Sequence, residues 1–436
     1  MTTNNPQDGT QLVRIEKPVY GGTFLARVDG KAVFVPLALA GEEARVRIAE
    51  EKRGYATAEV EEIVVASPER IEPRCPHFGG CGGCSYQHTG YAQQLEIKRA
   101  ILRETLERGG VNAPEEIDVL AGEPWGYRNR IRLAFDASGR MGYRGRGSHA
   151  VIPLEACPIA APLLLDAARA ATEVLQTKAR MLRPTEIALF ANAEESELQV
   201  SVYARTAARG AFEVFARGLA ERVPALKGAE LVMEQAAQGR RGIPQQKTVA
   251  RWGASSIVYR AAGHEYRVDH GAFFQVNRWL VDGLVERVTQ GATGKLAWDL
   301  FAGVGLFARV LADRFERVVA VEAAPMATDA LAANLAGTGG KAVKASTAEF
   351  LRRAGTKERP DFVVVDPPRA GLGAEVTAAP GALKAERMVY VSCDPATLAR
   401  DLKALTASGY AVERVTMADL FPHTFHLETV VELRRA

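Results

Sequence analysis

The chain has 436 residues, more than one ordinary domain holds, so we expect two or three domains. Hydrophobic residues (47%) and charged residues (25%) occur in the proportions of a globular protein, and no apolar run is long enough to cross a membrane. The polar N-terminus has no apolar signal core, so the expected location is cytoplasmic. A net charge of +3 indicates that any surface for a polyanion must be local.

Residues 13–65 have the pattern of short β-strands, with alternating apolar and polar residues and turns at Gly21-Gly22 and Asp29-Gly30. Short strands at this density predict a small closed barrel. The stretch resembles a TRAM domain, a barrel appended to RNA-modifying enzymes. Such barrels often bind nucleic acid, but the architecture alone leaves a structural role equally open.

Five cysteines divide into a set of four and one that stands alone. Cys75, Cys81 and Cys84 are spaced C-x5-C-x2-C with four glycines among them, and Cys157 follows after a long gap. An odd, clustered set argues against a disulfide framework, and four soft thiolates suit either zinc or an iron–sulfur cluster. The single C-x2-C pair and the Cys-Pro at the fourth position favour a [4Fe–4S] cluster, with zinc as the alternative.

Residues 124–149 are strongly basic, with six arginines against one acidic residue, Asp136. Trp125, Tyr127 and Tyr143 are interleaved among them. Arginines with aromatic residues on a hairpin suit phosphates and unstacked bases, so we predict an RNA-binding surface rather than an ordinary solvated strand face. The arginines predicted to contact RNA are Arg128, Arg130, Arg132, Arg144 and Arg146.

A helix is expected over residues 91–108, and helical and strand patterns alternate from residue 162 to residue 260 without recognisable chemistry. We therefore predict three domains. They are a β-barrel at residues 10–67, a central α/β domain at 68–268 with the four cysteines and the arginine hairpin, and a catalytic domain at 269–436.

The last third alternates strands and helices, with acidic residues at strand ends. Residues 295–301 form an apolar strand that runs into a Gly-x-Gly turn at 303–305, where a ligand can approach the backbone. Glu322 ends the next strand, at the separation from Asp299 that suits a carboxylate binding both hydroxyls of a ribose. Asp366 ends a third strand. This plan predicts a Rossmann-like class I methyltransferase that uses S-adenosylmethionine (SAM), and the missing GxGxxG disfavours a dinucleotide.

Cys393 lies on a tight turn between an apolar strand, residues 388–391, and a helix opened by Pro395. Ligands of open α/β sheets bind at this end of the strands. Backbone N–H groups and the helix dipole there favour the thiolate, which predicts a nucleophile. On this stretch alone, a small buried filler residue is the alternative.

Five motifs in order resemble the RNA 5-methyluridine methyltransferases, the family of the bacterial enzymes for 23S rRNA and for the tRNA T-loop. They are HGAFFQVN (270–277), DLFAGVG (299–305), VVVDPPRAGL (363–372), YVSCDPATLARDL (390–402) and FPHTFHLETVVEL (421–433). With the TRAM-like start and the four cysteines, the resemblance covers nearly the whole chain.

The resemblance implies a role for each matching residue. Cys393 would be the nucleophile and Glu428 the general base. The expected SAM contacts are Gln275, Phe301, Glu322 and Asp366, with Asp299, Gly303 and Gly305 at the loop. The iron–sulfur ligands would be Cys75, Cys81, Cys84 and Cys157. Two positions depart from the pattern, because Leu306 stands where some members carry Asn and Thr347 replaces an Asp or Asn near the adenine.

The implied chemistry explains these residue types. C5 of uracil is a poor nucleophile, and attack of a thiolate on C6 gives an enolate with carbanion character at C5, which can take a methyl group. A base must then remove the C5 proton so that the thiolate can leave, and one activated Cys with one carboxylate suffices. The uracil must be flipped out or single-stranded to be reached.

We therefore expect a monomeric enzyme, without a membrane partner, that methylates C5 of a uridine in structured RNA, with 23S rRNA favoured over tRNA. One alternative is an RNA cytosine-5 methyltransferase, which also uses Cys and SAM but lacks the four-Cys centre and the HTFHLE ending. The other is an RNA-binding protein with an iron–sulfur site and an inactive methyltransferase domain. Cys393, Asp366 and Glu428 count against the last.

Overall fold

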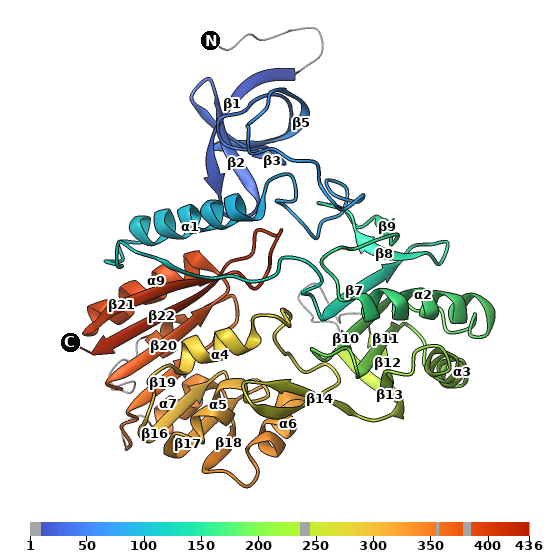
Figure 1. Ribbon diagram of the computed structural model, residues 1–436, viewed down its shortest axis with the longest axis vertical. Helices are drawn as coiled ribbons and strands as arrows, with labels where there is room; N and C mark the ends of the chain where they lie inside the picture. The colour runs from blue at the N-terminus through green and yellow to red at the C-terminus, as the bar shows by residue number, and fades with distance from the viewer. Residues whose placement is uncertain (1–9, 236–244, 355–356, 378–384, 436) are drawn as a thin grey trace.

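The structure is a computed structural model that describes residues 10–235, 245–354, 357–377 and 385–435. A small barrel stands at one end, above a lobe built on a seven-stranded sheet and a lobe built on an eight-stranded sheet (Figure 1). A two-stranded ribbon of β14 (Ser256–Ala261) and β15 (His264–Asp269) lies between the two sheets along the chain. Among the described helices, none is both long and apolar enough to cross a membrane.

The N-terminal barrel is closed, as the sequence predicted. Its strands are β1 (Thr10–Val19), β2 (Thr23–Val28), β3 (Lys31–Pro36), β4 (Glu43–Glu51) and β5 (Tyr55–Val65). They follow the order β1-β2-β3-β5-β4, with β1 paired to both β2 and β4. Alternation buries Val13, Ile15, Val33 and Val35 inside the barrel while their neighbours face outward, which is the reason for the period-two pattern.

The central lobe has a seven-stranded sheet with two helices on one face. Its strands are β7 (Arg130–Phe135), β8 (Met141–Arg144), β9 (Val151–Pro153), β10 (Glu186–Ala191), β11 (Leu198–Ala204), β12 (Leu226–Gln235) and β13 (Gln245–Gly253), in the order β13-β12-β11-β10-β7-β8-β9. Helices α2 (Pro162–Thr177) and α3 (Arg209–Ala220) bury Leu164, Phe212 and Phe215 against Leu189 and Val200 of the sheet.

The C-terminal lobe is a three-layer sandwich around an eight-stranded sheet. Its strands are β6 (Asp118–Leu120), β16 (Gly294–Leu300), β17 (Phe315–Glu322), β18 (Gly340–Lys344), β19 (Phe362–Val365), β20 (Arg387–Ser392), β21 (Tyr410–Ala418) and β22 (Glu428–Arg435), in the order β18-β17-β16-β19-β20-β22-β21-β6. One face carries α4 (Val281–Thr289), α5 (Leu306–Leu311) and α6 (Pro325–Leu335), and the other carries α1 (Tyr91–Arg108), α7 (Thr347–Ala354), α8 (Gly373–Thr377) and α9 (Pro395–Ala407). This is the Rossmann-like arrangement that the alternation of strands and helices predicted.

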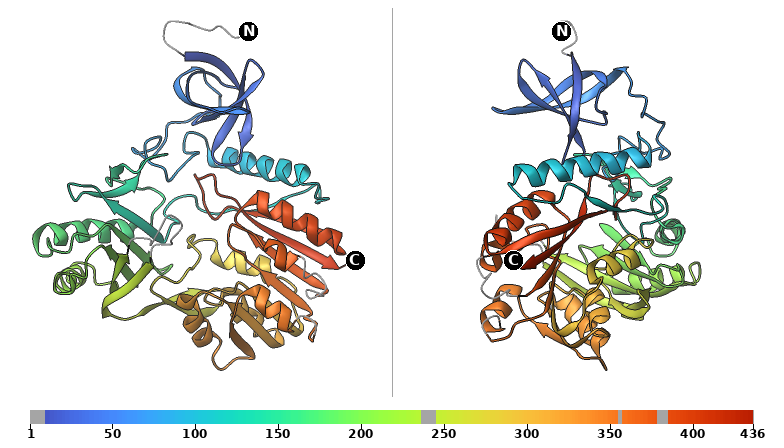
Figure 2. Two further views of the ribbon diagram at one scale, coloured as in Figure 1. Left: turned by 180° about the vertical axis from the view of Figure 1, so that it is seen from behind. Right: turned by 60° about the vertical axis from the view of Figure 1, so that its left-hand side comes forward.

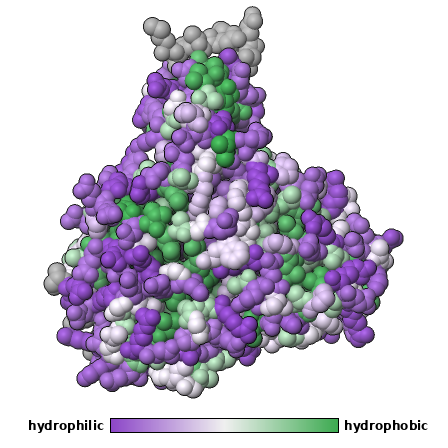
Figure 3. All heavy atoms as spheres, in the orientation of Figure 1, coloured by the Kyte–Doolittle hydropathy of each residue, from purple (hydrophilic) through white to green (hydrophobic). Residues whose placement is uncertain are grey.

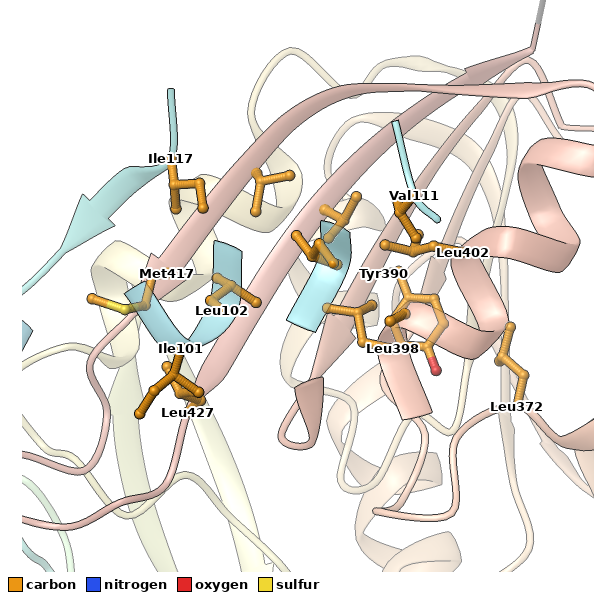
Figure 4. Packing of buried hydrophobic residues seen from close by; sticks show 14 of the residues in the cluster. Ile101, Leu102, Val111, Ile117, Leu372, Tyr390, Leu398, Leu402, Met417 and Leu427 are labelled. Carbon is orange, nitrogen blue, oxygen red and sulfur yellow. The ribbon is translucent and has the colours of Figure 1, made fainter. Parts of the chain in front are cut away.

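Two N-terminal elements are built into this lobe. Helix α1 buries Ile101 and Leu102 in the cluster that also holds Leu398 and Leu402 of α9, and Figure 4 shows Ile101 beside Leu427. Full burial of each leucine stabilises the fold by about 1.5–3 kcal/mol. Strand β6 pairs in parallel with β21 and ends the sheet. Residues 68–268, expected as one central domain, are therefore divided between the two lobes.

The barrel stands above α1, as both views in Figure 2 show, and Lys17 of β1 pairs with Glu104 of α1 at 2.6 Å. Hydrophilic residues cover much of the face in Figure 3, with apolar residues in patches between them. Exposed large apolar side chains include Phe273 and Trp279, which belong to the predicted HGAFFQVN motif and its flank.

Candidate active site

Cys393 and Glu428 meet at one edge of the eight-stranded sheet because their strands run in opposite directions. Strand β20 ends at Ser392 and β22 begins at Glu428, and Ser392 pairs with Thr429 in antiparallel register. Cys393 therefore lies immediately beyond the last paired position, next to the residue that opens β22. The predicted nucleophile and the predicted base are brought together by this strand pair.

The helix that follows Cys393 is capped by its neighbour Asp394. The Asp394 Oδ1 accepts hydrogen bonds from the backbone N–H groups of Ala396 (3.0 Å) and Thr397 (2.9 Å). Burial, followed by the charges of Glu428 and Asp366, raises the pKa of Cys393 to about 11. The prediction that the helix N-terminus favours the thiolate is therefore wrong for this structure, because Asp394 and not the thiol accepts from the free N–H groups.

Glu428 and Asp366 are two carboxyl groups in one buried region. Burial raises the pKa of Glu428 well above its usual value, and the charge of Asp366 raises it further. Asp366 follows β19, and burial raises its pKa to about 7. A carboxyl group whose pKa is raised toward neutrality is suited to accept and return a proton.

Arg369 supplies the opposing charge at this edge, and its role was not predicted from the sequence. Its guanidinium lowers the pKa values of both Cys393 and Glu428 against the effect of burial. Its Nη2 donates to Nδ1 of His426 at 3.0 Å, and burial, then Arg369, lowers the pKa of His426 to about 4, which keeps that ring a neutral acceptor. The signal was present in the sequence, since Arg369 ends the DPPR run that begins with Asp366.

The predicted SAM loop follows β16 and has left-handed backbone at three positions. Phe301 (φ 67°), Gly303 (φ 56°) and Gly305 (φ 92°) all have positive φ, and a Cβ at Gly305 would lie 2.7 Å from Leu331. Glu322, the last residue of β17, accepts the N–H of Gly303 at 2.8 Å through its Oε2. The loop and the strand-end carboxylate are thus joined before any ligand binds.

Three other predicted SAM contacts are buried side chains. Asp299 is fully buried, its Oδ2 accepts the N–H of Ala308 at 2.8 Å, and burial raises its pKa to about 8. Gln275 and Thr347 are also buried, the latter at the start of α7. Leu306 is a buried apolar residue at the start of α5 and supplies no polar group to the loop.

The four clustered cysteines are half-buried free thiols that influence one another electrostatically. Burial raises the pKa of Cys75, Cys81 and Cys84, the last to about 12, and in each case the charge of Cys157 adds to the effect. The Nε2 of Gln87 donates to the Cys84 Sγ at 3.3 Å. In the part of the chain that the structure describes, no group of three or more His, Cys, Asp or Glu side chains is placed as a metal site.

The predicted RNA-binding arginines do not form one free cationic face. Arg132 and Arg144 share the Glu186 carboxylate, at 2.5 and 2.8 Å, and Arg130 lies over the Phe190 ring, 4.1 Å from its centroid. The Nε of Arg128 donates to the backbone carbonyl of Arg130 at 3.1 Å. The side chain of Arg146 is exposed and has no hydrogen bond, ion pair or ring contact with any described residue.

Comparisons with known proteins agree with this arrangement. The chain matches the family described as tRNA (Uracil-5-)-methyltransferase over residues 258–436 and the TRAM domain over residues 9–60. It is 34% identical to the "23S rRNA (uracil(1939)-C(5))-methyltransferase RlmD" of Klebsiella pneumoniae subsp. pneumoniae, over 95% of this chain and 93% of that protein. The protein of the same name from Halomonas elongata is 32% identical, over 98% and 90% of the two chains.

A solved structure has the same fold. The Pyrococcus abyssi tRNA (uracil-54, C5)-methyltransferase in complex with S-adenosyl-L-homocysteine superposes with a TM-score of 0.76, at 24% identity, over 97% of this chain and 100% of that one. The sequences of the two relatives match this chain over both lobes and the barrel, and not only over the five motifs. The chain belongs to the family of RNA uracil-C5 methyltransferases.

Proposed function

We propose that the protein methylates C5 of a uridine in 23S rRNA, with SAM as the methyl donor. The relatives named as 23S rRNA (uracil(1939)-C(5))-methyltransferases match nearly the whole chain, including the barrel, at 32–34% identity. The observation that carries the proposal is the placement of Cys393 beside Glu428 at the carboxyl edge of a methyltransferase sheet. A tRNA substrate is the second candidate, because the superposed archaeal enzyme is named for tRNA.

In the proposed mechanism Cys393 adds to C6 of the uracil as a thiolate, and the electron pair of the C5–C6 double bond moves toward C5 and O4. SAM, when bound, would supply the methyl group to C5, with the electron pair of the broken S–CH3 bond left on its sulfur as S-adenosylhomocysteine leaves. Glu428 then takes the C5 proton, the double bond re-forms, and the C6–S bond breaks with its electrons returning to sulfur. Because the pKa of Cys393 is about 11 without RNA, the bound state must lower it, and Arg369 is the cation in place to do so.

We propose that SAM binds at the Gly-x-Gly loop. The carboxylate of Glu322 already accepts backbone N–H groups and can accept ribose hydroxyls in the same way. Asp366 lies between this carboxylate and the Cys393 edge. The remaining proposed contacts are Gln275, Asp299, Phe301, Gly303, Gly305 and Thr347.

We also propose that Cys75, Cys81, Cys84 and Cys157 hold a [4Fe–4S] cluster. Contacts between the two cysteine segments support this proposal, because the Nε2 of His77 accepts the N–H groups of Glu155 (3.2 Å) and Ala156 (3.5 Å), which directly precede Cys157. The Gln87 amide and the Gly83 N–H, which donate to Cys84 and Cys81, are typical partners of cluster sulfur atoms.

Labelled product analysis tests the proposed reaction and its alternatives. The protein is incubated with methyl-labelled SAM and 23S rRNA, and the nucleosides are separated by mass spectrometry. The proposal predicts label in 5-methyluridine, whereas label in 5-methylcytidine would show a cytosine enzyme and no label would show an inactive domain. A parallel reaction with tRNA decides between the two substrates.

A further inference from the structure

The segment between β21 and β22, residues 419–427, leads directly into Glu428 and is held by parts of the chain that lie far away in sequence. Asp419, His423 and Thr424 are buried although all three are polar. A buried polar segment persists only where its groups are paired, so its partners decide its position.

Helix α1 holds the beginning of this segment. The Nζ of Lys98 donates to the Oδ1 of Asp419 at 2.6 Å and to the carbonyl of Phe421 at 2.9 Å. The two charged side chains are 1% and 0% exposed. A buried ion pair of this kind fixes the positions of its two side chains more than it adds to the net stability of the fold.

His423 holds the middle of the segment in a left-handed conformation, with φ at 67°. Its backbone N–H donates to the Oε1 of Gln94 at 2.9 Å, and its Nδ1 lies 3.1 Å from the Nε2 of Gln94. Its carbonyl accepts the N–H groups of Ser85 (2.8 Å) and Tyr86 (3.0 Å), directly after Cys84. The Trp125 ring stacks on the imidazole at 3.9 Å. A non-glycine residue with positive φ persists where its surroundings over-determine it, as they do here.

The barrel reaches the end of the same segment. Tyr20 lies edge-on to Phe425, with ring centroids 5.8 Å apart, and its hydroxyl donates to the Cys393 carbonyl at 3.4 Å. A Cβ at Gly22 would lie 3.3 Å from the Phe425 Cβ, so the β1–β2 turn fits closely here. The barrel, the four-Cys loop and α1 thus converge on one segment next to the candidate base.

We propose that residues 419–427 are a positioning segment for Glu428, and that His423, held by Gln94 and the backbone of Ser85 and Tyr86, is its central positioning residue. The inference rests on the proposed role of Glu428 as the general base. It assigns to the N-terminal half of the chain a part in the proton-removal step, in addition to any contact with RNA.

Two variants and a matched control test this proposal. His423→Asn keeps a residue that tolerates left-handed backbone but removes the ring and its stacking on Trp125. Gln94→Met removes both hydrogen bonds that the Gln94 side chain makes with His423, and Met has a volume similar to that of Gln. His264→Asn, in β15 beside Asp313, is a histidine replacement away from the segment.

In RNA-free protein, amide hydrogen exchange of residues 419–428 is expected to rise about tenfold in both test variants and not in the control. His423→Asn loses the ring contact with Gln94, and Gln94→Met loses both bonds to His423 and a third to the Thr89 carbonyl. During turnover on RNA, both should accumulate a methylated RNA–protein adduct, because the base that resolves it is displaced. Alkylation of Cys393 should be no slower than in the wild type, because a displaced Glu428 opposes the thiolate less. A role only in stability would slow all steps together.

Unchanged exchange in both variants, or faster exchange without adduct, would overturn the proposal. So would unfolding of both, because the contacts would then hold the fold and not the base. Glu428→Gln is measured in parallel. If that variant traps no adduct, the proposal that Glu428 is the base fails. The exchange data would still show whether His423 and Gln94 hold the segment.

Discussion

Cys393 and Glu428 lie next to each other because their neighbours Ser392 and Thr429 form the last pair between β20 and β22. Burial raises the pKa of Cys393 most, the charges of Glu428 and Asp366 raise it further, and Arg369 lowers it. The strand pair therefore places Glu428 among the groups that oppose the thiolate.

The first prediction uses these opposing charges. Glu428→Gln removes a negative neighbour, so the pKa of Cys393 should fall below about 11, and Arg369→Gln removes a positive one, so it should rise. The rate of iodoacetamide alkylation of the Cys393 peptide, followed by mass spectrometry across alkaline pH, gives each value. Glu413→Gln on β21 is the control. Equal pKa values in all four proteins would contradict the described electrostatics.

A second prediction concerns the four-Cys site. Anaerobically purified protein should be brown and contain about four iron and four sulfide per chain. Cys84→Ser should lose the cluster and weaken RNA binding before it affects SAM binding, because the cysteines lie apart from the Gly-x-Gly loop. Stoichiometric zinc without sulfide would show that the zinc alternative is correct.

The third prediction separates an RNA contact from a general charge effect. Arg146→Ala should weaken RNA binding and reduce the slope of log Kd against log salt by about 1, since a free guanidinium that meets a phosphate releases one counterion. Arg140→Ala removes the same charge, but Arg140 pairs with Asp136 at 2.8 Å. Equal effects of the two replacements would show that Arg146 is an ordinary solvated residue and makes no specific contact with RNA.

The fourth prediction concerns stability. Lys98→Met should lower the free energy of unfolding by about 3–5 kcal/mol, because it leaves Asp419 charged and unpaired in the interior. Lys17→Met breaks the partly exposed pair with Glu104 and should cost only about 0–1 kcal/mol. Urea titrations of both variants measure the difference. Similar values would mean that Asp419 finds another partner when Lys98 is lost.

Much of this architecture follows from local sequence pattern. Alternation in β1 to β5 predicted the barrel, and the residues of α1 were predicted within their observed bounds. Strand-end acids, the Gly-x-Gly turn and the Cys393 turn all fall where parallel strands end, because that edge is fixed once the strand direction is known.

What could not be predicted depends on long-range packing. The place of β6 beside β21 is set by three residues whose pattern carries no strand signal of its own. The raised pKa of Cys393 depends on Glu428 and Asp366, which come from two other strands. The arginines were predicted to be free because Glu186, which pairs with both Arg132 and Arg144, lies far away in the sequence, on the strand next to β7 in the sheet.

The most direct measurement of the central claim follows Glu428→Gln on its RNA substrate with methyl-labelled SAM. If Cys393 is the nucleophile and Glu428 the base, attack and methylation still occur, but the C5 proton leaves slowly and the thiolate cannot depart. A labelled RNA–protein adduct should therefore survive denaturing electrophoresis, and adding Cys393→Ala should abolish it. Turnover of Glu428→Gln at the wild-type rate with no trapped adduct would contradict the account.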